Sequence, residues 1–91
     1  MIHSTTVALQ PDDILSRAKR FFADRVPASS AFLEKEGPGF VVLRGEGGEE
    51  VVIRASQADG GSAVRASTLF FDQALDRFLS TLPLSGPVVV A

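Results

Sequence analysis

Apolar and polar residues alternate in short runs over positions 29–71, and glycine-bearing turns separate these runs. Alternation with a period of two is typical of strands that bury one face. The sequence therefore predicts four strands joined by three tight turns, which form an antiparallel meander. One amphipathic helix is expected before the meander and one after it.

The turns determine which side chains share a face of the predicted sheet. Asp59-Gly60 predicts a two-residue hairpin of type I′, in which both turn residues need a positive φ. At Glu46-Gly47-Gly48 a three-residue loop keeps the aliphatic residues in one row, whereas a two-residue loop brings Arg44 into that row. We expect the three-residue loop, because a slip of one residue turns every side chain to the opposite face.

The turn at Gly37-Pro38-Gly39 follows the same reasoning. A three-residue loop there aligns Leu33 with Leu43 and turns Glu34 and Glu36 to the outer face. The three turns then agree on one inner face, which is largely apolar. Its expected members are Ala31, Leu33, Val41, Leu43, Val51, Ile53, Ala55, Val64, Ala66, Thr68 and Phe70.

Two helices and one further strand flank the meander. Thr5–Leu9 is short and β-branched, which predicts a strand, and Pro11 suits the first turn of a helix that Pro27 ends. A second helix is expected from an N-cap at Asp72 to Pro83. The apolar stripe of the first helix is Ile14, Leu15, Ala18, Phe21, Phe22 and Val26.

The predicted fold is therefore α+β, in the order β-α-β-β-β-β-α. It is a two-layer sandwich in which a five-stranded antiparallel sheet carries both helices on one face, with the first strand antiparallel to the fifth. Residues 1–83 form this single domain. Residues 84–91 are either a loose tail or a short strand on a sheet edge, of this chain or of a neighbour.

Composition excludes several classes of function. The chain has no cysteine, so it has no disulfide or thiolate chemistry, and a cytoplasmic location is compatible with that. A net charge of -2 disfavours nucleic acid as the main partner. We find no membrane span and no secretion signal in the sequence. Tryptophan and tyrosine are absent, so phenylalanine must supply any aromatic contact surface.

No catalytic or metal-binding constellation stands out, and we expect neither a cofactor nor enzymatic activity. His3 is the only histidine and has no acid near it in the sequence, so it makes a poor metal ligand or general base. Glu46, Glu49 and Glu50 lack the spacing of a calcium loop and predict a solvated turn. The glycine-rich turns join strands and open no helix, so they are not phosphate loops.

The outer face of the predicted sheet mixes apolar and basic residues. Arg44 is expected opposite Glu50, and Arg54 opposite Arg65. Either arginine stems cover isolated phenylalanines on a wet surface, or another subunit packs on this face; an anion between Arg54 and Arg65 is a third interpretation. The interface candidates are Phe32, Phe40, Val42, Val52, Arg44, Arg54 and Arg65.

The inner face offers an alternative site. Its small residues either admit a helix closely or leave room for a ligand, and close packing is the default. The pocket candidates between sheet and helices are Phe21, Phe22, Ala55, Ala66, Phe78 and Leu79.

The segments Thr5–Leu9, Pro11–Leu15 and Phe71–Leu79 together resemble a helix-grip domain, the fold of the START and Bet v1-like polyketide cyclase superfamily. In that family a curved antiparallel sheet grips a C-terminal helix. The resemblance implies a hydrophobic small molecule held between sheet and helix. A TATA-binding-protein-like half-domain has a comparable element order, although the charge disfavours its use of nucleic acid.

Two functional hypotheses follow. The first is a non-catalytic domain that forms homo-oligomers or binds a protein partner through its outer sheet face. The second is a small helix-grip protein that binds a hydrophobic ligand between its sheet and its helices.

Overall fold

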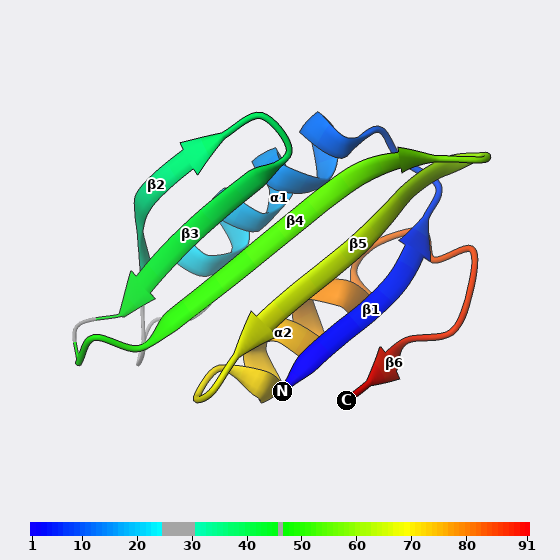
Figure 1. The fold of residues 1–91 in the computed structure, drawn as a ribbon. Helices are drawn as coiled ribbons and strands as arrows, with labels where there is room; N and C mark the ends of the chain where they lie inside the picture. The colour runs from blue at the N-terminus through cyan, green and yellow to red at the C-terminus, as the bar shows by residue number, and fades with distance from the viewer. Residues whose placement is uncertain (25–30, 46) are drawn as a thin grey trace.

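The computed structural model describes residues 1–24, 31–45 and 47–91. An open antiparallel sheet of six strands forms one layer of these described ranges, and two helices form the other (Figure 1). The strands are β1 (Ile2–Val7), β2 (Ala31–Gly37), β3 (Phe40–Gly45), β4 (Glu50–Ala58), β5 (Gly61–Thr68) and β6 (Val89–Val90), and the helices are α1 (Pro11–Asp24) and α2 (Asp72–Ser80). The α+β class and the placement of both helices on one face are thus confirmed.

The sheet order is β2-β3-β4-β5-β1-β6, so the sheet has one strand more than the five expected. β1 pairs antiparallel with β5, as predicted. The sixth strand comes from the C-terminal segment, where Val90 pairs with His3 and Val89 with Ser4. Of the two interpretations of residues 84–91, the strand on this chain's own sheet edge is therefore correct.

The predicted pairing of the meander is largely confirmed. Val41 lies opposite Ile53 and Leu43 opposite Val51, which is the predicted register; Glu46, in the turn predicted there, lies outside the described residues. Across the β4–β5 hairpin, Ile53 pairs with Ala66. The aliphatic row therefore faces the helices, where these five side chains are buried.

The turn between β4 and β5 is not of type I′, because the φ of Asp59 is not positive. Positive values occur at Gly60 (77°) and Gly61 (155°) instead. Gly61 lies against the end of β1, where an added Cβ would be 2.1 Å from the carbonyl oxygen of Val7. The close approach of two backbones, as well as the turn, thus requires glycine here.

The turn between β2 and β3 is shorter than predicted. Gly37 pairs with Phe40, which leaves a two-residue loop, and a bulge between Leu33 and Lys35 restores the alignment of Leu33 with Leu43. A bulge inserts one extra residue, so the residues beyond it point to the opposite face from the one that strict alternation predicts. Glu36 therefore faces the helices, against prediction, and its carboxylate lies 3.0 Å from Lys19 Nζ on α1.

Two expected members of the inner face are not buried. Leu33 belongs to the edge strand and remains 39% exposed. Phe70 is 73% exposed, because β5 ends at Thr68 and the chain turns away before α2. The alternation of the sequence continues past the strand, so it gives no sign of where pairing stops.

The boundaries of the remaining elements differ in detail. β1 begins at Ile2 and ends at Val7, because its partner strand starts at Gly61 and offers nothing to pair with Leu9. Asp72 is the first residue of α2 and not its N-cap; Phe71 occupies the cap position without a side-chain bond. An acidic residue in that first turn still favours the helix dipole. The predicted end of the first helix at Pro27, with Val26 in its stripe, lies outside the described residues.

Packing between the layers is dominated by phenylalanine. Phe22 lies in the middle of the cluster, with ring centroids 5.4 Å from Phe21, 6.1 Å from Phe78 and 6.3 Å from Phe71. Edge-to-face and tilted rings at these distances interact favourably beyond their area of contact. In the described part of the chain, no helix has the length and apolarity needed to cross a membrane.

Candidate functional site

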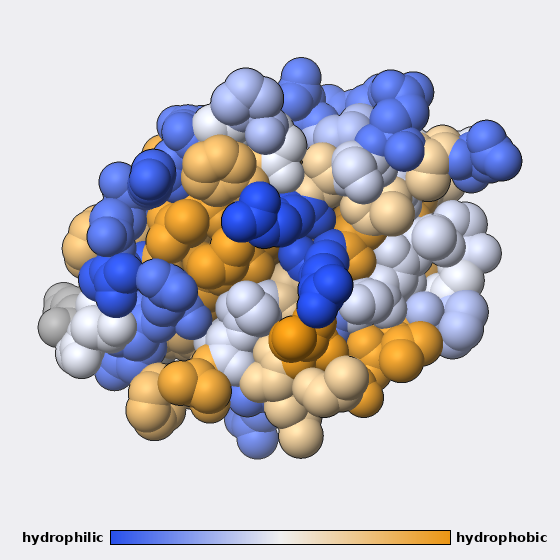
Figure 2. All heavy atoms as spheres, in the orientation of Figure 1, coloured by the Kyte–Doolittle hydropathy of each residue, from blue (hydrophilic) through white to orange (hydrophobic). Residues whose placement is uncertain are grey.

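The face of the sheet that lies away from the helices is the main candidate site. Figure 2 views this face and shows apolar surface over β3 and its neighbours, next to a strongly hydrophilic band across the middle. Phe40, Val42 and Val52 are half-buried there, and Phe32 on the edge strand is 56% exposed. No described element covers these side chains. We call Phe32, Phe40, Val42 and Val52 the outer apolar patch.

Arg44 stands at one end of the patch and is held by two acids. Its side chain donates hydrogen bonds to Glu34 and Glu50, at 2.8 Å for Glu50, and to the carbonyl of Gly48 at 2.9 Å. The pairing with Glu50 was predicted; Glu34 reaches Arg44 from the bulge in β2. The hydrogen bond to Glu34 raises the pKa of the Arg44 guanidinium above its ordinary value, so this residue stays charged.

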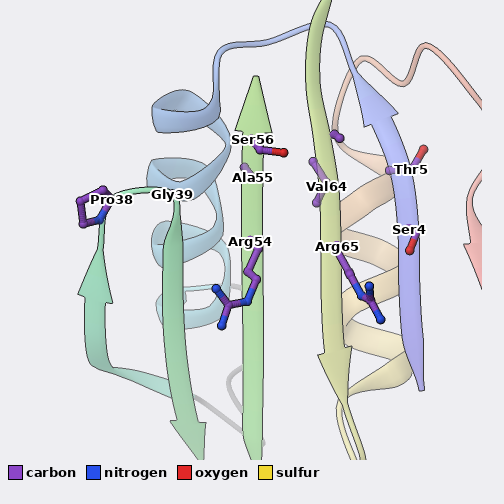
Figure 3. A pocket seen from close by; sticks show the side chains of 10 residues that line it. Ser4, Thr5, Pro38, Gly39, Arg54, Ala55, Ser56, Val64 and Arg65 are labelled. Carbon is purple, nitrogen blue, oxygen red and sulfur yellow. The ribbon is translucent and has the colours of Figure 1, made fainter. Parts of the chain in front are cut away.

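Arg54 and Arg65 are directly opposite each other on β4 and β5, as predicted. Figure 3 shows that their guanidinium groups point away from one another, Arg54 toward β3 and Arg65 toward β1. The Arg54 group lies 5.6 Å from the centre of the Phe40 ring, a cation–π contact. Neither arginine is paired with an acid of the described chain. The divergence relieves their repulsion and gives no support to an anion held between them.

A shallow groove of about 540 Å³ adjoins these arginines. It runs over the middle strands toward the β2–β3 turn, with Pro38 and Gly39 at one side, Ser4 at the other, and Ser56 and Ala63 along it (Figure 3). The small side chains of β4, β5 and β1 create the depression. The groove and the patch thus form one continuous surface on the outer face.

The alternative pocket residues lie on the inner side of the sheet. Phe22, Ala55, Ala66, Phe78 and Leu79 are buried and Phe21 is half-buried. The rings of Phe21 and Phe78 are 5.4 Å apart, so these side chains contact each other. Two depressions of the described surface lie elsewhere, one on the outer face and one at the end of β5.

His3 differs from its expected surroundings. It is buried between the sheet and α2, and its Nε2 lies 3.0 Å from Oδ1 of Asp72, 69 residues away in the chain. The expectation of no neighbouring acid thus holds along the sequence but not in space. Its Nδ1 is buried without a hydrogen-bond partner in the described residues, and no group of three metal-ligating side chains forms there. The pair links β1 to the start of α2.

The hydrogen bond from His3 lowers the pKa of Asp72, and the nearby terminal amino group contributes in the same direction. A carboxylate with a depressed folded-state pKa stabilises the fold above its unfolded pKa of about 3.9, and this stabilisation disappears as the pH falls through the folded value. We expect Asp72→Asn to reduce the free energy of unfolding at pH 6, and the difference from the unsubstituted chain to shrink steadily below about pH 4.

Urea denaturation of both chains between pH 6 and pH 2.5 measures this difference. A difference that stays constant over the whole range would show that the ionised Asp72 carboxylate does not contribute through its contact with His3.

The sequence did not predict that Leu69 and Phe70 are exposed. They are 81% and 73% exposed, and they line a second depression of about 290 Å³ with Ile2, Glu50 and Ser67. This depression lies at the end of the outer face opposite to the groove. A large exposed apolar pair is a typical contact surface for another chain. The only sequence signal was the position of Asp72, which shows that α2 begins soon after them.

The protein was compared with protein-family models, with curated proteins and with solved structures, and no match was found in any of the three comparisons.

Proposed function

We propose that this protein is a non-catalytic domain that self-associates through the outer face of its sheet. The observation that carries the proposal is the outer apolar patch, which lies on a sheet face that no described element covers. The helices bury the other face of the same sheet, so packing within the described chain covers only one of the two sheet faces. Two sheets that pack face to face are a common way to bury such a surface.

The size of the surface suits a stable interface. The molecule measures 37 × 24 × 19 Å, and its sheet extends over the two larger dimensions (Figure 1). A standard protein–protein interface buries about 800 Å² on each partner. A face of this extent supplies that area without any rearrangement of the fold.

The helix-grip alternative, a hydrophobic ligand between sheet and helices, receives no specific support. The aromatic rings in that region are in mutual contact, and Phe22 and Phe78 are fully buried among protein atoms. A ligand there would have to displace these contacts. We therefore favour the outer face as the functional surface.

The substitution Val42→Lys tests this function. Val42 lies in the middle of the outer apolar patch, so a lysine there would place a charge in the centre of the interface and should weaken association at least about tenfold. The fold should remain, because a lysine stem can lie along the exposed sheet surface. Sedimentation equilibrium measures association, and circular dichroism of the dilute chain measures folding.

The matched control is Ala23→Lys, which adds the same charge at an exposed position of α1 on the opposite side of the molecule. It should leave the association constant unchanged. Equal effects of the two substitutions, or none from Val42→Lys, would remove the outer face as the site of association.

A further inference from the structure

The outer face carries a symmetric arrangement of side chains that points to the geometry of the association. Three cross-strand pairs lie side by side on β3 and β4: Phe40 with Arg54, Val42 with Val52, and Arg44 with Glu50. The middle pair is aliphatic, and each outer pair contains an arginine. Relative to the middle pair, Arg54 and Glu50 occupy equivalent positions on β4, and so do Phe40 and Arg44 on β3.

We propose that a second copy of this chain packs on the outer face around a two-fold axis that runs along the Val42–Val52 pair, parallel to the sheet and perpendicular to its strands. This inference rests on the proposed self-association and specifies its partner contacts. The rotation exchanges the two outer pairs. Arg54 then faces Glu50 of the partner subunit, and Phe40 faces Arg44 of the partner subunit. Each contact occurs twice, as an isologous interface requires.

Charge selects this axis over the other in-plane one. A two-fold axis parallel to the strands and midway between β3 and β4 exchanges the members of each cross-strand pair, so Arg54 would face Phe40 of the partner subunit and Arg44 would face Glu50 of the partner subunit. That arrangement repeats contacts already made within one chain and gives Arg54 no acid. An axis between β4 and β5 would set Arg54 against Arg65 of the partner subunit, a costly juxtaposition of like charges. The perpendicular axis instead gives Arg54 the acidic partner that it lacks within the described chain.

The side chains are long enough for these contacts. Sheets that pack face to face lie about 10 Å apart, a distance that arginine and glutamate span together. Glu50 uses Oε2 for its 2.8 Å contact with Arg44, which leaves its other oxygen available as an acceptor. Arg44 can approach the partner's Phe40 ring while it keeps Glu34, because a guanidinium group presents a flat face as well as its N–H edge.

The same rotation also accounts for the two ends of the outer face. The groove lies beyond Arg54, whereas the exposed Leu69 and Phe70 lie at the Glu50 end. Exchange of the ends brings the apolar pair of each subunit to the groove end of the other. In this arrangement the exposed apolar pair would lie over a depression of about 540 Å³ that is lined partly by small side chains.

Charge reversal at Glu50 and Arg54, the two charged positions of β4 on either side of Val52, provides the test. Glu50→Arg alone and Arg54→Glu alone should each weaken association at least about tenfold. In either variant positions 50 and 54 carry the same charge, so both symmetry-related contacts become repulsive. The double variant Glu50→Arg/Arg54→Glu should regain the association constant of the original chain to within about threefold, which is the usual size of context effects on surface pairs.

Mixing the two single variants is the sharpest measurement. Position 50 of one chain then faces position 54 of the other with opposite charge, at both ends of the interface. We expect a heterodimer in native mass spectrometry, where the two chains are distinguished by mass, although each variant alone is mainly monomeric. Arg17→Glu, an exposed reversal on α1, is the control and should neither weaken association nor form a heterodimer with Glu50→Arg beyond the statistical mixture.

The outcomes separate this inference from the proposed function. If the original chain associates and Val42→Lys abolishes association, but the single variants fail to pair on mixing, the outer face is the interface and this axis is wrong. If the single variants associate as the original chain does, the axis is also wrong. If the original chain does not associate at all, the proposed function fails with it.

Discussion

Replacement of Phe22 by alanine is expected to lower the free energy of unfolding by about 3–5 kcal/mol, because it leaves a cavity at the centre of the aromatic cluster. The Phe22 side chain is fully buried, and its ring contacts the rings of Phe21, Phe71 and Phe78 from both helices and the segment before α2. Neither helix can close the gap without losing its own contacts with the sheet. Urea denaturation followed by circular dichroism measures the change.

Phe32→Ala is the matched control, since it removes the same side chain from the outer face. Phe32 is 56% exposed on the edge strand, so its loss should cost under about 1 kcal/mol at chain concentrations that keep the protein monomeric. If both substitutions destabilise the chain equally, the assignment of the inner and outer faces is wrong.

Gly61→Ala is expected to destabilise the fold by about 2–5 kcal/mol, which combines an unfavourable backbone conformation with a steric clash. The φ of Gly61 is 155°, and an added Cβ would lie 2.1 Å from the carbonyl oxygen of Val7 and 3.0 Å from Cα of Ala8. These are backbone atoms that cannot rotate away. The end of β1 must therefore separate from β5, which weakens the pairing of Val7 with Ser62.

Gly60→Ala separates the two causes. Gly60 also has a positive φ, of 77°, but an added Cβ there meets no atom within 4 Å. Its replacement should cost only the left-handed conformation of alanine, about 1–2 kcal/mol. Thermal or urea unfolding of both variants measures the difference, and a larger loss at Gly60 than at Gly61 would contradict the close contact between β1 and the hairpin.

The pairing of the central strands could be predicted because the number of residues in a turn determines which side chains share a face of the sheet. A loop with the wrong number of residues brings Arg44 into the row of Val41, Val51 and Ile53, and one charge in an apolar row is enough to exclude it. The paired strands β3, β4 and β5 therefore agree with the prediction. The same turn lengths place Val42, Val52, Arg54 and Arg65 together on the outer face, as the pairing shows.

The bulge in β2 could not be predicted from the residues that surround it. Glu34, Lys35 and Glu36 are all charged, so no apolar residue indicates which of them faces the helices. The face of a strand residue cannot be predicted from the sequence where apolar and polar residues do not alternate. As a result Glu36, expected outside, makes its ion pair with Lys19 on the helical side.

Contacts between distant parts of the chain could not be predicted from the sequence either. His3 and Asp72 meet only because β1 pairs with β5 at the point where α2 begins. The C-terminal strand was one of two open alternatives, since an apolar segment fits either a free tail or a sheet edge; hydrogen bonds between Ile2 and Ala91 show that it follows β1. The exposed Leu69 and Phe70 continue the apolar pattern beyond the end of β5, where burial no longer follows alternation.

Sedimentation equilibrium of the unsubstituted chain, over a series of loading concentrations up to high micromolar, measures whether the chain self-associates. We expect a mass that rises with concentration from that of the 9.6 kDa chain to twice that value. A mass that remains that of a single chain at every concentration would contradict self-association.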